Sequence, residues 1–307
     1  MKNRHRPQAA DVGLTRRTML RGLGLAALLP IVPSLADAQA SAAAPASGAT
    51  QASAATPAGG ATAGPQLPLK TTGLEHMGTV VPDVEAAGKF YGRLFNPELY
   101  KEKEPPLRYY VTLGVGYLAL GSRANQPKPF FDHYCALVQD YNGQAMADEL
   151  KTRGLPAGRF GIIPDPDNIG LQLLGVPGGL AKSTEAAGRI VEGDALVKPI
   201  GLHEVVLHVP DVEKSLAFYR QFFGKESHRS HKPDGATFEI SGTRLVIETA
   251  SAGEEPRINR IGIKVQKFDS ASVGKELTKM GATLEKGAKG ALRFRDPLGL
   301  GIELLPA

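Results

Sequence analysis

The chain has 307 residues, and its 42% of hydrophobic residues is enough for one to three domains with packed cores. Its single cysteine, Cys135, excludes an intrachain disulfide and a cysteine-based zinc cluster. The formal net charge is +5, but six basic and two acidic side chains within residues 1–38 supply +4 of it. The remaining +1 argues against general nucleic-acid binding, because that binding draws its affinity from clustered Lys and Arg.

Residues 1–38 have the pattern of an export signal. Charged residues, among them Arg16 and Arg17, precede an apolar run at 23–36 that is too short for a comfortable membrane span. Small residues at 36–40 offer a signal-peptidase cleavage site. The arginine pair resembles a twin-arginine signal, with an ordinary Sec signal as the alternative. We therefore expect a periplasmic or secreted protein that uses the twin-arginine export machinery and has no stable membrane anchor.

Residues 39–69 are predicted to be a disordered linker. Between 41 and 66 almost every residue is Ala, Ser, Thr, Gly or Pro, and none is charged. Such a stretch cannot bury enough apolar surface to offset the entropy lost on ordering. We expect it to separate the signal from the folded part of the chain.

An internal repeat organises the rest of the sequence. Residues 73–85 and 201–213, at an offset of 128, share Gly, Leu, Val, Pro, Asp, Val and Glu, and Phe-Tyr pairs follow at 90–91 and 218–219. In each copy the Pro ends a strand and the Asp can cap the helix that follows. A duplicated unit is therefore predicted.

The predicted elements follow the same order in both copies. After the first strand and helix, the first copy has alternating strands, a further strand and helix, and a closing strand, at 108–113, 117–120, 133–138, 144–153 and 165–174. The second copy has the corresponding elements at 237–240, 244–248, 260–265, 270–280 and 296–305. This order predicts an α+β protein of four βαβββ modules, paired into domains at 70–178 and 198–307 with a linker at 179–197.

The Pro-Asp-Val-Glu turns, their Phe-Tyr helices and the two terminal Asp-Pro strands together resemble the vicinal oxygen chelate superfamily. The resemblance covers about residues 70–307. This superfamily holds glyoxalases, bleomycin-resistance proteins and extradiol dioxygenases, and four modules in one chain look most like the extradiol and hydroxyphenylpyruvate dioxygenase layout. The resemblance implies that each pair of modules curls into an open-barrel cup, which can hold a divalent metal on its inner face.

The resemblance also implies a ligand set for such a metal. Dioxygenase-type members use a His on the first strand, a His on the fifth and a Glu on the eighth, and the first copy has His76, His133 and Gln172 there. Two imidazoles and an oxygen donor suit Fe²⁺, Mn²⁺, Ni²⁺ or Zn²⁺. Because Gln172 brings no charge, we expect weaker binding and a more Lewis-acidic ion. The alternative is a decayed site that binds no metal.

The second copy has different residues in the three ligand positions, namely Glu204, Arg260 and Glu303. Arginine has no lone pair to donate and cannot replace a ligating histidine. The sequence therefore predicts that Arg260 lies between the two carboxylates and that the second cup is ion-paired and free of metal.

Several other residues have two interpretations. Cys135, on the same face of its strand as His133, either lines the cup or is a small core residue. Three tyrosines and His208 could face a substrate or ligand, or could be ordinary strand residues; the tyrosines are Tyr109, Tyr110 and Tyr117. No general base or other catalytic residue is assigned.

The first functional hypothesis is an exported, divalent-metal-dependent enzyme that acts on a small oxygenated organic substrate, either as a dioxygenase or as a glyoxalase-like lyase or isomerase. The second is a binding protein of the bleomycin-resistance type that sequesters a small molecule without metal. A third is a structural or partner-binding role with both cups closed by side chains. Whether the protein forms a homo-oligomer stays open.

Overall fold

The computed structural model describes residues 67–155, 161–175, 180 and 183–307. The predicted signal at 1–38 and all but the last three residues of the predicted linker at 39–69 lie outside these ranges. Across the described ranges, every helix is too short or too polar to cross a lipid bilayer.

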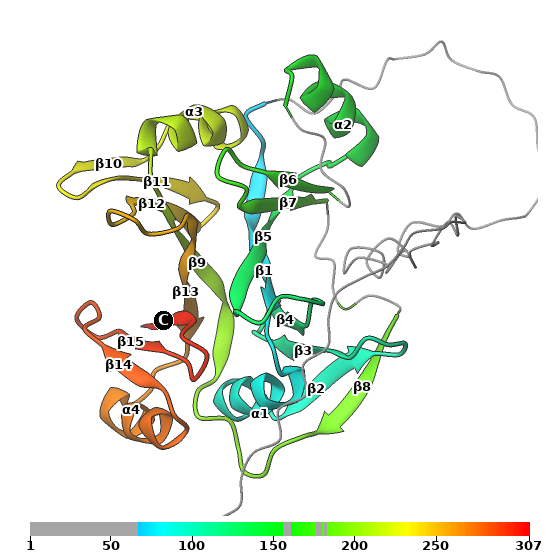
Figure 1. Ribbon diagram of the computed structural model, residues 1–307, viewed down its shortest axis with the longest axis vertical. Helices are drawn as coiled ribbons and strands as arrows, with labels where there is room; N and C mark the ends of the chain where they lie inside the picture. The colour runs from blue at the N-terminus through cyan, green and yellow to red at the C-terminus, as the bar shows by residue number, and fades with distance from the viewer. Residues whose placement is uncertain (1–66, 156–160, 176–179, 181–182) are drawn as a thin grey trace, which may run out of the picture. The chain divides into compact units, whose positions relative to one another are not determined.

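The first sheet has eight strands in the order β6-β7-β5-β1-β4-β3-β2-β8 (Figure 1). The neighbouring strands β1 and β5 are antiparallel and join the two modules, while β4 lies parallel to β1 and β7 lies parallel to β5. The elements of this half are β1 (Thr71–Val80), α1 (Val84–Leu94), β2 (Glu98–Glu102), β3 (Arg108–Thr112), β4 (Tyr117–Gly121), β5 (Phe130–Val138), α2 (Gly143–Thr152), β6 (Ile162–Pro164), β7 (Gly170–Leu174) and β8 (Thr184–Arg189).

The second sheet also has eight strands, in the order β10-β11-β12-β9-β13-β16-β15-β14. Its central pair, β9 and β13, is antiparallel, as β1 and β5 are in the first sheet. The elements of this half are β9 (Pro199–Val209), α3 (Val212–Phe223), β10 (His228–His231), β11 (Asp234–Ile240), β12 (Thr243–Thr249), β13 (Arg257–Val265), α4 (Ser270–Lys279), β14 (Thr283–Glu285), β15 (Leu292–Arg295) and β16 (Gly301–Pro306).

This arrangement confirms the predicted α+β fold with one correction. Among the described residues, the second module of the first sheet has two strands after its helix, β6 and β7, where three were predicted. The eighth strand is β8, which pairs antiparallel with β2 at the opposite edge of the sheet. The stretch at 179–197, predicted as a linker, therefore contains a strand of the first sheet.

The repeated Pro-Asp turns act as predicted. The side chain of Asp83 accepts a hydrogen bond of 2.9 Å from the backbone N–H of Ala86, and Asp211 accepts one of 3.0 Å from Lys214. Each Asp thus satisfies one of the free N–H groups in the first turn of α1 or α3.

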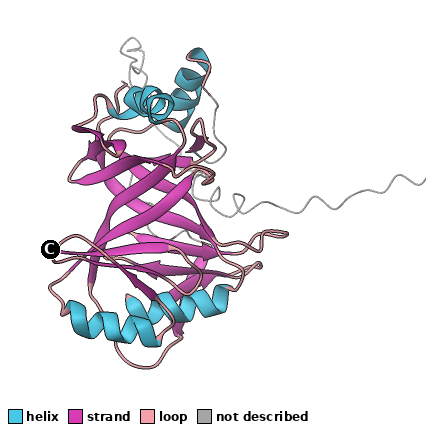
Figure 2. Cartoon of the chain, turned by 60° about the vertical axis from the view of Figure 1, so that its left-hand side comes forward, coloured by secondary structure: helices cyan, strands magenta, loops and turns pink. Residues whose placement is uncertain are grey.

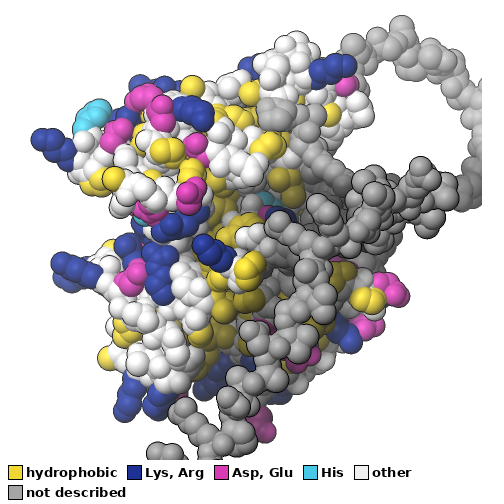
Figure 3. Space-filling view, viewed as in Figure 1, with side chains coloured by type: hydrophobic (Ala, Val, Ile, Leu, Met, Phe, Trp, Pro, Cys, Tyr) yellow, Lys and Arg dark blue, Asp and Glu magenta, His cyan; other side chains and the backbone are white. Residues whose placement is uncertain are grey.

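The helices lie outside the strands (Figure 2). Each Phe-Tyr pair is buried in a continuous apolar core, with Phe90 and Tyr91 on α1 and Phe218 and Tyr219 on α3. On the face of the molecule in view, Lys and Arg side chains are interspersed with Asp and Glu (Figure 3).

Candidate metal centre

The three side chains predicted as metal ligands lie on adjacent strands, β7, β5 and β1, and they come together. The imidazole rings of His76 and His133 are perpendicular, with centroids 5.6 Å apart. The side chain of Gln172 lies close to that of His76. All three are buried, with 0%, 7% and 2% of their surfaces exposed. We call the inner face of the first sheet around these three residues the first cup.

Two glycines make room for the ring of His133. Its cross-strand neighbours are Gly78 on β1 and Gly170 on β7. A Cβ atom at Gly78 would overlap the imidazole of His133, and one at Gly170 would lie 2.7 Å from the Cβ of His133. Only glycine at these positions lets the ring lie across the sheet toward His76.

A carboxylate holds each imidazole at Nδ1. Oε2 of Glu75 lies 2.9 Å from Nδ1 of His76, and Oδ2 of Asp132 lies 3.0 Å from Nδ1 of His133. Because the carboxylate accepts, Nδ1 is the protonated nitrogen and Nε2 keeps a lone pair. This is the arrangement in which metal-ligating histidines are commonly held.

The Nε2 atoms of His76 and His133 are both buried and make no hydrogen bond. Buried polar atoms without a partner are uncommon and call for an explanation. Burial is the largest influence on His76, and it lowers the pKa of this residue despite the opposing hydrogen bond with Glu75. A neutral imidazole with an unused lone pair is what a divalent ion requires. The donor set therefore fits a metal.

The wall beside His76 is aromatic. The ring of Tyr117 stacks on that of His76, with centroids 4.6 Å apart and an interplanar angle of 8°. The hydroxyl of Tyr110 hydrogen-bonds Glu102, and Nη1 of Arg108 lies 3.4 Å from the same hydroxyl. Burial raises the pKa of Tyr110 to about 12, so this phenol is protonated at neutral pH. Of the three tyrosines singled out in the sequence, these two face the cup.

Tyr109 faces the other side of β3. Its ring lies 2.7 Å from where a Cβ of Gly88 on α1 would be, so it packs against that helix. It is an ordinary core aromatic and not a group of the first cup.

A cavity of about 320 Å³ opens beside His133. Two arginines line it, Arg108 from β3 and Arg123 from the turn after β4, and Asp132 and small residues of β1, β4 and β7 complete the wall. Asp132 bridges His133 and Arg123, whose Nη2 lies 2.9 Å from Oδ1 of the carboxylate. A volume of this size accepts a small organic molecule.

Cys135 lies near the same site. The ligating atoms of Glu75, His76 and Cys135 are all within 4.8 Å of one another. The thiol is fully buried, and burial together with the charge of Glu75 raises its pKa well above the usual value. Cys135 therefore lies beside the first cup as a buried, protonated thiol.

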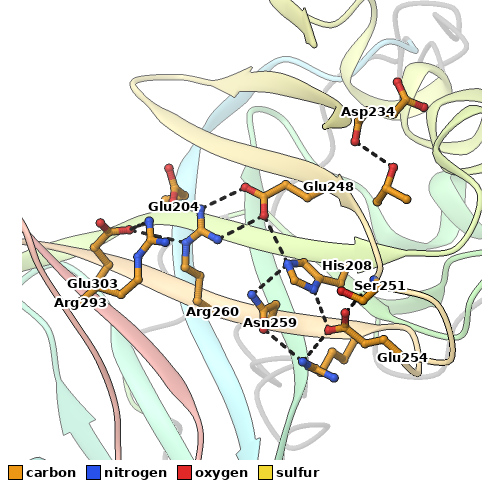
Figure 4. A network of polar contacts seen from close by, with 12 residues as sticks. Glu204, His208, Asp234, Glu248, Ser251, Glu254, Asn259, Arg260, Arg293 and Glu303 are labelled. Atoms are coloured by element: carbon orange, nitrogen blue, oxygen red, sulfur yellow. Dashed lines mark hydrogen bonds and ion pairs between the residues drawn. The ribbon is translucent and has the colours of Figure 1, made fainter. Parts of the chain in front are cut away.

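The second cup has the predicted ion pairs (Figure 4). Arg260 lies between Glu204 and Glu303, with its nitrogens 3.8 Å and 3.5 Å from their carboxylate oxygens. A third carboxylate, Glu248, was not predicted and lies closer, at 3.2 Å. The guanidinium thus occupies the place that corresponds to the first cup's His133.

His208 is tied into this network. Its Nδ1 lies 2.7 Å from Glu254, and its Nε2 lies 3.3 Å from Glu248 and 2.9 Å from the amide nitrogen of Asn259. The hydrogen bond with Glu248 is the largest influence on His208 and raises its pKa. Both imidazole nitrogens are engaged, so His208 is a structural member of the network and has no lone pair left for a ligand.

The sequence reasoning missed the two carboxylates that hold the histidines. A local signal for them exists, because each candidate histidine directly follows an acidic residue, in Glu75-His76 and Asp132-His133. Strict strand alternation places such neighbours on opposite faces. The pairing of β1 with β5 is irregular between Leu74 and Met77, and irregularities of this kind re-aim side chains beside functional sites.

No family model and no curated protein matches this chain in sequence. Solved structures share its fold. A catechol 2,3-dioxygenase has a TM-score of 0.58 and 17% identity, over 78% of this chain and 88% of that one. The Mn(II)-bound glyoxalase from Novosphingobium aromaticivorans has a TM-score of 0.56 and 14% identity, over 78% and 83%. The 2,3-dioxygenase LapB from Pseudomonas sp. KL28 has a TM-score of 0.57 and 13% identity, over 78% and 93%.

These likenesses extend over most of both chains in each comparison. The chain therefore shares the fold of these dioxygenases and of this glyoxalase, with its two eight-stranded mixed sheets. At these identities the likeness defines the fold, and function has to be argued from the site.

Proposed function

We propose that this chain is an exported, metal-dependent enzyme of the vicinal oxygen chelate type that acts on a small oxygenated organic molecule. One observation carries the proposal, namely that the Nε2 atoms of His76 and His133 are buried without a hydrogen-bond partner on rings held by carboxylates. An apolar or structural role would not need two such lone pairs beside each other.

His76, His133 and Gln172 would hold the ion, which is Fe²⁺, Mn²⁺, Ni²⁺ or Zn²⁺. When bound, it supplies Lewis acidity toward the oxygens of the substrate and, if it is iron, reactivity with O₂. The protein itself holds the side chains that would donate electron pairs to the ion. Glu75 and Asp132 set the orientation of the two imidazoles, and Tyr117 covers the ring of His76.

The cavity beside His133 would bind the substrate. Arg108 and Arg123 line its wall, where Arg108 pairs with Glu102 and Arg123 pairs with Asp132. Arginine recognises planar oxyanions through its fork of N–H donors. We therefore infer that the substrate presents oxygen atoms, which could accept hydrogen bonds from the arginines while an oxygen pair lies toward the histidines.

The choice between dioxygenase and lyase or isomerase depends on the metal. Export by the twin-arginine machinery is part of the proposal and rests on the sequence of residues 1–38. This route carries folded proteins, which suits a site whose ion is bound before export.

The first test is elemental analysis of the protein, purified without chelator or immobilised metal, beside the variant His76→Ala. We expect about one equivalent of one of the four metals, lost in the variant. Its identity then selects the assay, which is O₂ consumption for iron and lyase or isomerase screens for the others. If no metal binds even after reconstitution, the proposal fails and sequestration of a small molecule takes its place.

A further inference from the structure

Cys135, the one cysteine of the chain, has its side chain on the inner face of the first cup. It lies two residues from His133 on β5, so strand alternation puts both side chains on the same face. The neighbouring residues Tyr134 and Ala136 belong to the apolar core, and Cys135 does not. The thiol is therefore a group of the cup and not one of the small residues that fill the core.

The sulfur of Cys135 lies close to the predicted ligands on both neighbouring strands. On β7 its register partner is Gln172, and on β1 a ring nitrogen of His76 lies within 4.8 Å of Sγ. Cys135 and His76 are both 0% exposed. Among the described residues, Sγ has a hydrogen-bond contact of 3.8 Å with the backbone oxygen of Ala136, and a thiol is a weak donor. The sulfur can therefore turn to an ion at little cost.

A second observation points to a ligand at this place. Within the part of the chain that the structure describes, the buried Nε2 atoms of His76 and His133 have no hydrogen-bond partner. Packing alone does not account for two such lone pairs. A cysteine sulfur beside two open imidazole nitrogens is the donor chemistry of a zinc site.

The three predicted ligands bring no charge of their own to an ion. The imidazoles of His76 and His133 are neutral and the amide of Gln172 is uncharged, whereas the usual facial set includes a carboxylate. Glu75 lies behind the ring of His76, at 2.9 Å from Nδ1. A thiolate would bring one negative charge directly to the ion. The thiol gives up its proton as the ion binds, since a coordinating thiol is deprotonated outright.

We infer that the thiolate of Cys135 is a ligand of the ion in the first cup, together with His76 and His133, and that the site selects Zn²⁺ over Mn²⁺. Soft thiolate ligands favour zinc, whereas Mn²⁺ prefers oxygen donors. Because Zn²⁺ has no redox chemistry, the reaction that follows is that of a lyase or isomerase and not of a dioxygenase. This inference rests on the proposed function, because it needs a metal in the first cup.

The first test loads the purified full chain with Co²⁺, which replaces Zn²⁺ and absorbs light, and records the spectrum. Because the chain has one cysteine, a thiolate-to-cobalt charge-transfer band can come only from Cys135. We expect this band in the unaltered chain and its loss in Cys135→Ser and in His76→Ala. Bound Co²⁺ without the band would overturn the inference and leave the metal site on His76, His133 and Gln172 intact. A band that survives in His76→Ala would place the sulfur on an ion outside the first cup, which also overturns it.

The second test compares the affinities for two ions. Mn²⁺ binding is followed by electron paramagnetic resonance, and Zn²⁺ binding by the release of bound Mn²⁺. We expect Cys135→Ser to weaken Zn²⁺ binding by at least about tenfold and Mn²⁺ binding by less than about threefold. Thr79→Ser is the matched control, since it is a small change at a buried residue of the cavity wall, and it should leave both affinities within about threefold.

Equal losses of Zn²⁺ and Mn²⁺ affinity in Cys135→Ser would overturn the inference, because they would mean that the substitution disturbs the cup as a whole. Should Cys135→Ser fail to fold, the Co²⁺ spectrum of the unaltered chain decides the question. If the unaltered chain binds none of the three ions, the proposed function fails together with this inference.

Discussion

The hydroxyl of Tyr91 on α1 donates a hydrogen bond of 2.7 Å to Oδ2 of Asp296, which lies 205 residues further along the chain. A second contact mirrors it, since the hydroxyl of Tyr219 on α3 donates 2.8 Å to Oδ2 of Asp165. Each tyrosine comes from the repeated Phe-Tyr helix of one half, and each aspartate from the Asp-Pro turn of the other half. The duplicated motifs thus bind the two halves to each other.

We expect Tyr91→Phe to destabilise the protein by about 1–3 kcal/mol, because it removes a hydrogen bond from a buried carboxylate. Asp296 is 4% exposed and would be left with backbone donors, among them the N–H groups of Leu298 and Leu300. The measurement is the urea concentration at the midpoint of unfolding. The dependence of the unfolding free energy on urea concentration should stay unchanged. Tyr100→Phe is the matched control, since Tyr100 is 38% exposed. Equal midpoints for the two variants would show that the Tyr91 hydroxyl contributes nothing to stability.

The repeat made most of the fold predictable. Pro-Asp turns and Phe-Tyr helices mark both copies in the sequence, and they predicted the strands and helices that lie beside them. The strand β8 could not be predicted, because Thr184–Arg189 has no large apolar residue and no clear alternation. It is a strand only because β2 lies beside it, and that pairing is non-local.

The three candidate metal ligands could be predicted from the sequence, because their places depend on the order of the strands within the modules. The resemblance to the family supplied the three ligand positions, and His76, His133 and Gln172 come together because β1, β5 and β7 are neighbouring strands. The positions of Glu75 and Asp132 depend on local irregularity of the strands and on close packing, which the sequence pattern does not encode. For the same reason the cavity with Arg108 and Arg123 emerged only in the folded chain.

The second cup gives a prediction about stability. Arg260→Gln should destabilise the protein by about 3 kcal/mol, the low end of the usual loss for a broken buried ion pair. Glu204 and Glu303 are each 3% exposed, and they would lose the cation between them. The loss is limited because Arg244 and Arg293 also pair with these two carboxylates.

The control for this variant lies on the same strand. Arg257→Gln removes a contact of an arginine whose side chain is 44% exposed, so it should cost less than about 1 kcal/mol. Urea unfolding of both variants at neutral pH decides the question. A loss for Arg260→Gln no larger than that for Arg257→Gln would show that the buried carboxylates do not need this cation.

The network around His208 predicts a pH dependence. The hydrogen bond with Glu248 raises the pKa of His208, while the same bond lowers the pKa of Glu248 to about 2. A raised pKa in the folded state means that protonated His208 stabilises the protein below its unfolded pKa of 6.5. This contribution is lost as the pH rises through the folded pKa.

The variant His208→Gln tests this dependence. The difference in unfolding free energy between the unaltered chain and the variant should be largest near pH 6 and should shrink toward about pH 9. His228→Gln, at an exposed position on β10, reports the effect of losing a histidine as such. If this difference in unfolding free energy stayed constant or grew as the pH rose, His208 would not be charged between the two glutamates.

The glycine beside His133 gives a prediction for the first cup. Gly78→Ala should abolish metal binding or lower the affinity more than about tenfold, because the new methyl group displaces the imidazole. Metal content is measured by elemental analysis, as for His76→Ala, and affinity by titration with Mn²⁺. Gly143→Ala is the control, since its Cβ would have its nearest neighbour at 3.7 Å. Full occupancy in Gly78→Ala would mean that the ring of His133 is not a ligand in this position.

Gln172→Glu should have opposite effects on the metal-free and the metal-bound protein. With metal, the added carboxylate brings a negative charge to the ion, and we expect affinity to rise by about tenfold or more, which is about 1.4 kcal/mol. Without metal, a new charge at a position only 2% exposed, close to Glu75, should lower the melting temperature. Gln172→Met is the control, because it removes the oxygen donor and adds no charge. Melting curves recorded with and without Mn²⁺ show whether the substitution raises the melting temperature of the metal-bound protein and lowers that of the metal-free protein. If the carboxylate faced away from the ion, the same charge would lower both melting temperatures, and the assignment of Gln172 to the metal would be wrong.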